Sequence, residues 1–243
     1  MNQSIRGYWE RSRSPRYSLL LVLPLVGAYE LLAASLATGA GGVRNGADAI
    51  LRSLFSTFLG PYGPLAFGLL IFLVCVWLFR RDMRASGGDL KASVLLLMAF
   101  EAVVLASLFG IVVGTVTAHL LNPFHGLAMG LQAGLSAPQR LMVSLGAGVY
   151  EELLFRVILV SALTYTCREI FGWSTVRSAI GAVLVSATIF SLFHYIGPHG
   201  DTFAVPSFLF RFVAGVFFSA LYVLRGFGIT AWTHALYDVY LLF

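Results

Sequence analysis

The run ASVLLLMAFEAVVLASLFGIVVGTV, residues 92–116, decides the fold class. Glu101 is its single ionisable residue. At about 1.5 Å per residue, a helix of this length covers roughly 37 Å, which exceeds the ~30 Å hydrocarbon core of a bilayer. The run therefore predicts a helix that crosses a membrane.

Apolar runs of this kind recur along the whole chain. The mean hydropathy is +0.85, and only 11% of the 243 residues are charged, against about 25% in soluble domains. The runs lack the alternation of barrel strands, and 14% aromatic residues exclude intrinsic disorder. We therefore predict an all-α, polytopic bundle of about seven transmembrane helices. The predicted spans cover residues 18–38, 64–79, 92–116, 140–166, 176–194, 203–224 and 229–243.

Positive residues predict the orientation of these spans. With the N-terminus in the cytoplasm, cytoplasmic segments carry eleven Lys and Arg residues, and outer segments carry only Arg44, Arg52 and Arg140. This bias follows the positive-inside rule, so the basic residues do not indicate a nucleic-acid partner. The compact length and the lack of a eukaryotic retention signal favour a prokaryotic cytoplasmic membrane. Residues 47–59 read equally well as a short interfacial helix or a loop.

Ionisable residues inside the spans are the main functional signal. Each costs several kcal/mol unless it is paired or hydrated. Six of the nine form three short patterns in the last four spans, whereas Glu30 and Glu101 have no evident partner. The nine residues are Glu30, Glu101, Glu151, Glu152, Arg156, His194, Arg211, His234 and Asp238.

The first pattern is Glu-Glu-Leu-Leu-Phe-Arg at residues 151–156. On an α-helix Glu152 and Arg156 stand at i and i+4 and can form an ion pair. Glu151 points about 100° away from Glu152, so one carboxylate can be neutralised while the other serves as a general base. Just before it, Ser144 and Gly148 form a small-residue step that allows close helix packing.

The other two patterns add histidines. Phe190 and His194 share a helix face one turn apart, and His234 and Asp238 share a face of the last span. Their depths place all three patterns in the outer half of the bilayer, where they can form a polar cavity reached from the extracytoplasmic side. Arg211 has a similar depth; it is either a complement to the carboxylates or substrate, or a packing arginine.

The ordered set Glu-Glu-x-x-x-Arg, Phe-x-x-x-His and His-x-x-x-Asp, each on its own apolar helix, resembles the CPBP family. This family, also called Abi, includes type II CAAX prenyl endopeptidases and bacteriocin-processing proteins. The resemblance covers residues 140–243, which suggests a catalytic bundle of spans four to seven after a variable membrane region, residues 1–139.

The resemblance implies an intramembrane glutamate endopeptidase. Glu151 would be the base that activates water, and His194 would help to hold and deprotonate that water. His234 and Asp238 would hold the scissile carbonyl and its oxyanion, while Glu152 and Arg156 would support the helix and tune Glu151. The eukaryotic prenyl endopeptidases resemble an Asn version of the third motif. Asp238 departs from it, and an anionic carboxylate cannot donate to an oxyanion.

Three functions fit these residues. The first is a metal-independent protease that cleaves a membrane-associated or exported protein or peptide, such as a lipidated protein or a C-terminal sorting tail. The second is a zinc protease that uses Glu151, His194 and His234 as ligands, although no His-Glu-x-x-His motif is present. The third is a proton-coupled carrier or membrane chaperone. No phosphate loop, dinucleotide fingerprint or haem motif indicates a cofactor.

Overall fold

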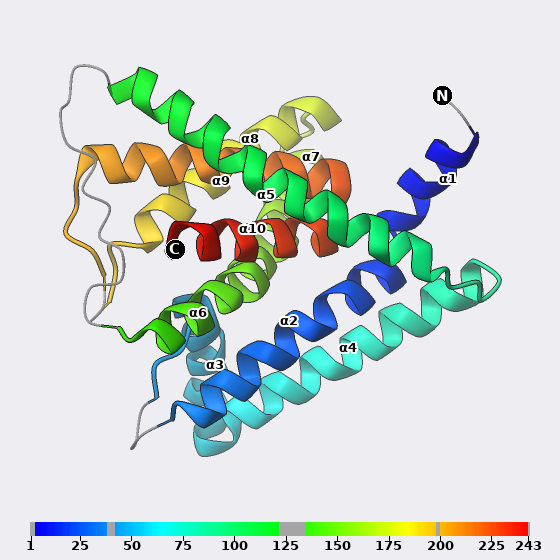
Figure 1. Cartoon of the computed structure of the whole chain (residues 1–243), viewed down its shortest axis with the longest axis horizontal. Coiled ribbons are helices and arrows are strands. Elements are labelled where there is room, and N and C mark those ends of the chain that lie inside the picture. Colours follow the sequence, from blue (N-terminus) through cyan, green and yellow to red (C-terminus); the bar gives the residue numbers. More distant parts are fainter. Residues whose placement is uncertain (1–2, 38–41, 122–134, 198–199, 243) are drawn as a thin grey trace.

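A computed structural model describes residues 3–37, 42–121, 135–197 and 200–242 (Figure 1). Every regular element in these ranges is helical, which confirms the predicted all-α bundle. Residues 38 and 243, at the ends of the first and last predicted spans, lie outside the described ranges. The elements are α1 (Gln3–Ser12), α2 (Pro15–Ser35), α3 (Gly46–Leu59), the 3-10 turn η1 (Gly60–Tyr62), α4 (Gly63–Ala85), α5 (Ala92–Leu121), α6 (Ala137–Gly146), the π-helix η2 (Ala147–Val160), α7 (Ser161–Glu169), α8 (Thr175–Phe193), α9 (Val205–Arg225) and α10 (Phe227–Leu242).

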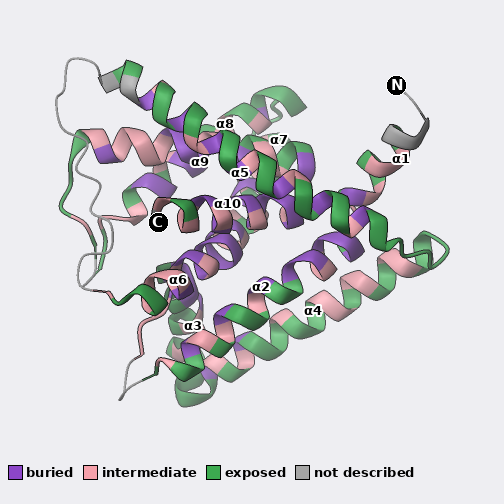
Figure 2. Ribbon diagram, in the orientation of Figure 1, coloured by how far each residue is buried: buried purple, intermediate pink, exposed green. Residues whose placement is uncertain are grey.

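Five helical segments among the described residues are long and apolar enough to cross a membrane. They are Pro15–Ser35, Gly46–Ala85, Ala92–Thr117, Thr175–Phe193 and Val205–Arg225. The predicted span 140–166 is helical but divided into three shorter segments, and α10 has only 16 residues. Figure 2 shows α4 exposed along much of its length although it is apolar. Such a surface suits lipid, and the chain is an integral membrane protein.

Helix α10 lies at the centre of the bundle and contacts α2, α5, α6, η2 and α9 (Figure 1). Its buried face includes Ala231 and Ala235, whose small side chains let neighbouring backbones approach closely. The indole Nε1 of Trp232 donates to the carbonyl oxygen of Leu21 at 2.6 Å and so ties α10 to α2. This central helix carries His234 and Asp238.

Glu101, for which the sequence indicated no partner, belongs to a polar network between α1, α5 and α9. Its carboxylate receives hydrogen bonds from Arg225 at 2.6 and 2.7 Å and from the Tyr8 hydroxyl at 2.6 Å. Burial, together with this hydrogen bond, raises the pKa of the Tyr8 phenol above its usual value. The network fastens α1 to the bundle and is separate from the three motifs.

Helices α3 and α4 form a tight hairpin. The turn begins at Gly60, whose φ of 55° is disfavoured for residues with a side chain. Residues 47–59 are helical, which confirms the helix of the two readings of this stretch; its place at the membrane interface stays a prediction. The helix starts at Asn45, whose side-chain oxygen accepts from the Ala47 N–H at 2.9 Å as an N-cap.

The predicted α-helix over 140–166 is only partly correct, because its centre is the π-helix η2. In a π-helix each N–H bonds the carbonyl five residues back, and such segments are often found at functional sites. Packing from α8 supports it, since the Ser186 hydroxyl donates to the Phe155 carbonyl oxygen at 2.9 Å. The periodicity of the side chains along residues 140–166 does not reveal the π-helix, because the π-helix depends on contacts with other helices.

Candidate active site

The π-helix carries Glu151, Glu152 and Arg156, and all three side chains are buried. One guanidinium nitrogen of Arg156 lies 3.1 Å from Oε1 of Glu152, which confirms the predicted i,i+4 ion pair. Both members of this pair are fully buried, so the charges neutralise each other away from water. Glu152 is thus the neutralised carboxylate of the two.

Glu152 has a second partner on α10. Nδ1 of His234 lies 2.6 Å from the same Oε1 and donates its proton to the carboxylate. Nε2 of His234 lies 3.7 Å from Asp238, which confirms that His234 and Asp238 share a face. The carboxylate that orients the His234 ring is therefore Glu152, while Asp238 lies beyond hydrogen-bond distance.

The third pattern meets the other two at the end of α8. His194 follows the last residue of the helix, and its Nδ1 donates to the Phe190 carbonyl oxygen at 2.9 Å. This bond leaves Nε2 of a neutral ring as the acceptor. The Phe190 ring lies 4.9 Å from the His194 ring and 6.3 Å from that of His234, between centroids. The structure thus brings the motif residues of η2, α8 and α10 together.

Glu151 differs from its neighbour in its partners. Oε1 of Glu151 accepts a hydrogen bond from the amide Nδ2 of Asn45 at 2.8 Å, and no ion pair to Glu151 occurs within the described ranges. His194 and His234 both lie within electrostatic range of it. Glu151 is 6% exposed, whereas His194 and Asp238 are half-buried, so the cluster opens on the side of these two residues.

Aromatic rings line the inner side of the cluster. The Arg156 guanidinium lies 4.5 Å from the Phe190 centroid and 5.5 Å from that of Phe218, within the range of cation–π attraction. Phe218 also stacks on the His234 ring at 4.2 Å. These contacts hold the Arg156 guanidinium and the His234 ring in place. Among the described residues, no hydrogen bond to the guanidinium is made. Phe218 and Asn45 were missed from the sequence, because a Phe in an apolar run and an Asn in a turn are both ordinary.

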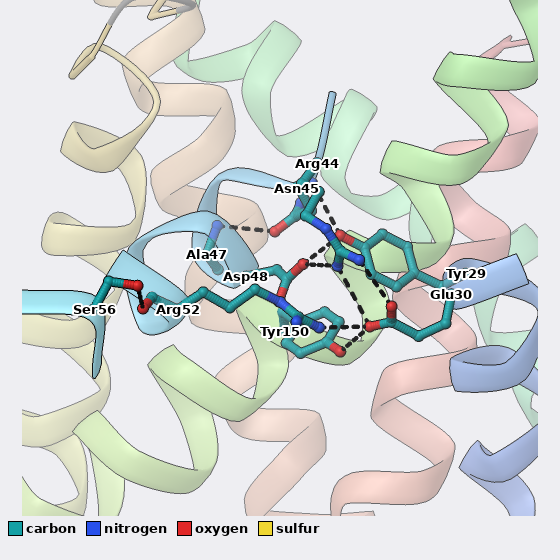
Figure 3. Close-up of polar contacts among 9 residues, drawn as sticks. All are labelled: Tyr29, Glu30, Arg44, Asn45, Ala47, Asp48, Arg52, Ser56 and Tyr150. Carbon is teal, nitrogen blue, oxygen red and sulfur yellow. Dashed lines mark hydrogen bonds and ion pairs between the residues drawn. The ribbon is translucent and has the colours of Figure 1, made fainter. Parts of the chain in front are cut away.

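A second polar cluster, centred on Glu30, includes Tyr150, the residue before Glu151 (Figure 3). Glu30, for which no partner was evident from the sequence, receives hydrogen bonds from Arg44 at 2.9 Å, Arg52 at 2.7 Å and the Tyr150 hydroxyl at 2.9 Å. Both arginines also bind Asp48, which is fully buried. Tyr150 immediately precedes Glu151, so this cluster supports the start of the Glu-Glu-x-x-x-Arg motif.

Arg211 pairs with Asp201 and lies over the Tyr195 ring, 5.3 Å from its centroid. It has a partner of its own outside the motif carboxylates. For metal binding, the described part of the chain contains no group of three His, Cys, Asp or Glu side chains arranged to hold an ion. Glu151, His194 and His234 are therefore not arranged as such a group among these residues, and Nδ1 of His234 is bonded to Glu152.

Comparison with known proteins concerns the segment that carries the three motifs. Residues 133–240 match the family described as type II CAAX prenyl endopeptidase Rce1-like. This matched segment, which is less than half of the chain, is similar to the Rce1-like family. It contains every residue of the three motifs, and the match supports their resemblance to the CAAX-type membrane proteases. Neither the curated proteins nor the solved structures that were compared gave a match.

Proposed function

We propose that this Rce1-like chain is an intramembrane endopeptidase in which Glu151 activates water. The observation that carries the proposal is the unequal pairing of the two adjacent carboxylates. Glu152 is engaged by both Arg156 and His234, whereas Glu151 makes one neutral hydrogen bond, to Asn45. A carboxylate without a counter-ion bonded to it, beside two histidines, suits a general base.

The chemistry follows from the protons that the hydrogen bonds define. Water held between Glu151 and Nε2 of His194 gives a proton to Glu151 as its oxygen attacks the scissile carbonyl carbon. The carbon–nitrogen bond then breaks, and the proton on Glu151 passes to the leaving amine. His194 suits this role because its Nδ1–H is committed to the Phe190 carbonyl, which leaves Nε2 free to accept.

The developing oxyanion needs a donor, which we assign to Nε2 of His234. Nδ1–H of that ring is bonded to Glu152, and the ring is stacked on Phe218, so its orientation is fixed before substrate binds. When protonated, Nε2 can donate to the oxyanion. Asp238, 3.7 Å from Nε2, is placed to balance the positive charge of the protonated ring.

The orientation of the chain determines which substrates can reach this site. We infer a cytoplasmic N-terminus in a prokaryotic inner membrane, from the excess of basic residues in the predicted cytoplasmic segments. In that orientation the cluster opens to the outer side, which favours exported or membrane-anchored protein substrates. We further infer that residues 140–243 carry the chemistry and that residues 1–139 support it.

The test compares the termini of membrane and secreted proteins in cells that carry wild-type protein or Glu151→Gln. The substitution keeps size and removes the base. We expect one or a few proteins to retain an extra segment in the mutant. Glu169→Gln, at an exposed position of the same continuous helix, is the matched control and should process them normally. Unchanged termini with abundant, folded Glu151→Gln would contradict the proposal and favour a carrier or chaperone.

A further inference from the structure

Asn45 connects the N-terminal region to the motif carboxylates, although it lies 106 positions before Glu151. It is 2% exposed and follows the segment that leads from α2. Its amide Nδ2 donates to Oε1 of Glu151 at 2.8 Å, and its Oδ1 accepts from the Ala47 N–H at 2.9 Å. One side chain thus caps α3 and contacts the proposed base.

The N-cap determines which end of the amide faces Glu151. The Ala47 N–H is a donor and requires the amide oxygen, so the amide nitrogen must point to the other side. There it meets a carboxylate, which can only accept when ionised. Both ends of Asn45 are therefore matched, and an inverted amide would lose both hydrogen bonds.

The backbone of Asn45 is held as firmly as its side chain. Its N–H donates to the Tyr29 hydroxyl at 3.2 Å, and that hydroxyl donates to Asp48 at 2.7 Å (Figure 3). Behind it, Gly146 leaves no room for a side chain: an added Cβ would lie 2.8 Å from Cβ of Asn45. The Glu30 cluster and the helix that carries Glu151 thus fix the position of this amide from both sides.

We propose that Asn45 is a positioning residue for Glu151. Its amide holds Oε1 of the carboxylate and leaves Oε2 to take the proton from the attacking water. The inference rests on the proposed function, because it assigns a task to Asn45 only if Glu151 is the base. A neutral amide suits this task, because it donates a hydrogen bond without forming an ion pair with the base.

Two substitutions separate positioning from the structural role of a helix cap. Aspartate and serine are both good N-cap residues, so Asn45→Asp and Asn45→Ser keep the cap and lose the amide donor. A purely structural role predicts wild-type activity for both. The positioning role predicts that Asn45→Ser lowers kcat by about 10- to 100-fold with little change in KM, since misplacement of a catalytic group by about 1 Å has effects of this size. Ser174→Ala, which removes the exposed cap of α8, controls for cap loss elsewhere.

The pH profile of Asn45→Asp adds a second readout. Two buried carboxyl groups this close share a proton, so only at high pH are both ionised. There the introduced carboxylate cannot donate to Glu151, and we expect the lowest activity. At acidic pH the same carboxyl group is protonated and can donate, so activity should recover relative to wild type. Rates are measured on a peptide that spans the cut site revealed by Glu151→Gln.

An infrared measurement on purified protein needs no substrate. The carboxylate bands of Glu151, assigned by subtracting the spectrum of Glu151→Gln, should shift in Asn45→Ser and stay in place in Ser174→Ala. Unshifted bands, or shifted bands with kcat within two-fold of wild type, would overturn the positioning role. If the proposed function itself is wrong, Glu151→Gln will cleave as well as wild type. This result differs from those that overturn the positioning role of Asn45.

Discussion

Replacing Gly148 by alanine tests the contact between the two helices that form the site. Gly148 lies on η2 against α10, as the predicted small-residue step requires. An added Cβ would overlap the carbonyl oxygen of Ala231 and lie 2.7 Å from Cβ of Ala235. Carbon atoms pack at about 3.5–4.0 Å, so the helices must separate by about 1 Å. The obstructing atoms include backbone, which a rotamer change cannot move.

The same helix pair carries the hydrogen bond between Glu152 and His234. A shift of about 1 Å would lengthen it from 2.6 Å to roughly 3.6 Å, beyond a hydrogen bond. We expect overpacking to cost about 1–3 kcal/mol of unfolding free energy. The catalytic loss should be larger, about 100-fold, because the oxyanion donor is displaced.

The assay measures the cleavage rate per folded protein, together with the unfolding midpoint in detergent. Gly68→Ala is the matched control, because Gly68 is a helical glycine with open space where the Cβ would lie. It should leave both quantities close to wild type. If Gly148→Ala cleaves within two-fold of wild type, the reasoning from helix contact to catalytic geometry is refuted.

Three further outcomes are expected. Glu101→Leu leaves Arg225 buried without its counter-ion and should lower the free energy of unfolding by about 3 kcal/mol. Adding Arg225→Met should recover most of this stability. A double variant as unstable as Glu101→Leu would contradict the explanation. Elemental analysis of purified protein should find no stoichiometric zinc, and a chelator should leave cleavage unchanged; one tightly held zinc per chain, with activity lost to the chelator and restored by zinc, would favour the metalloprotease. A reporter fused after residue 243 should behave as extracytoplasmic, and a cytoplasmic signal would reverse the proposed orientation.

The helical elements could be predicted from the sequence because the bilayer imposes a strong rule. A backbone in hydrocarbon must satisfy its own hydrogen bonds, so each apolar run becomes a helix. The pair of Glu152 and Arg156 was also predictable, since it depends only on spacing along one helix. The shared faces of Phe190 with His194 and of His234 with Asp238 follow from the same local geometry.

Contacts between distant segments were beyond this reasoning. Nothing in the pattern around Asn45 distinguishes it from any turn asparagine, and its bond to Glu151 exists only because α3 packs against η2. The partners of Glu30 and Glu101 come from other helices for the same reason. The cost of an ionisable residue in the membrane predicted that these residues need partners, but the sequence could not say which.

The sequence by itself determined that the chain is a helical membrane bundle with three polar motifs on its last helices, because apolar length and helical periodicity are local properties. The tertiary structure decided that Glu152 contacts both Arg156 and His234, and that Asn45 is bonded to Glu151. It also decided that the helix carrying the two glutamates is widened to a π-helix. These features depend on which helix faces meet and how closely they pack. Such choices are set by side-chain volume and charge across the whole bundle.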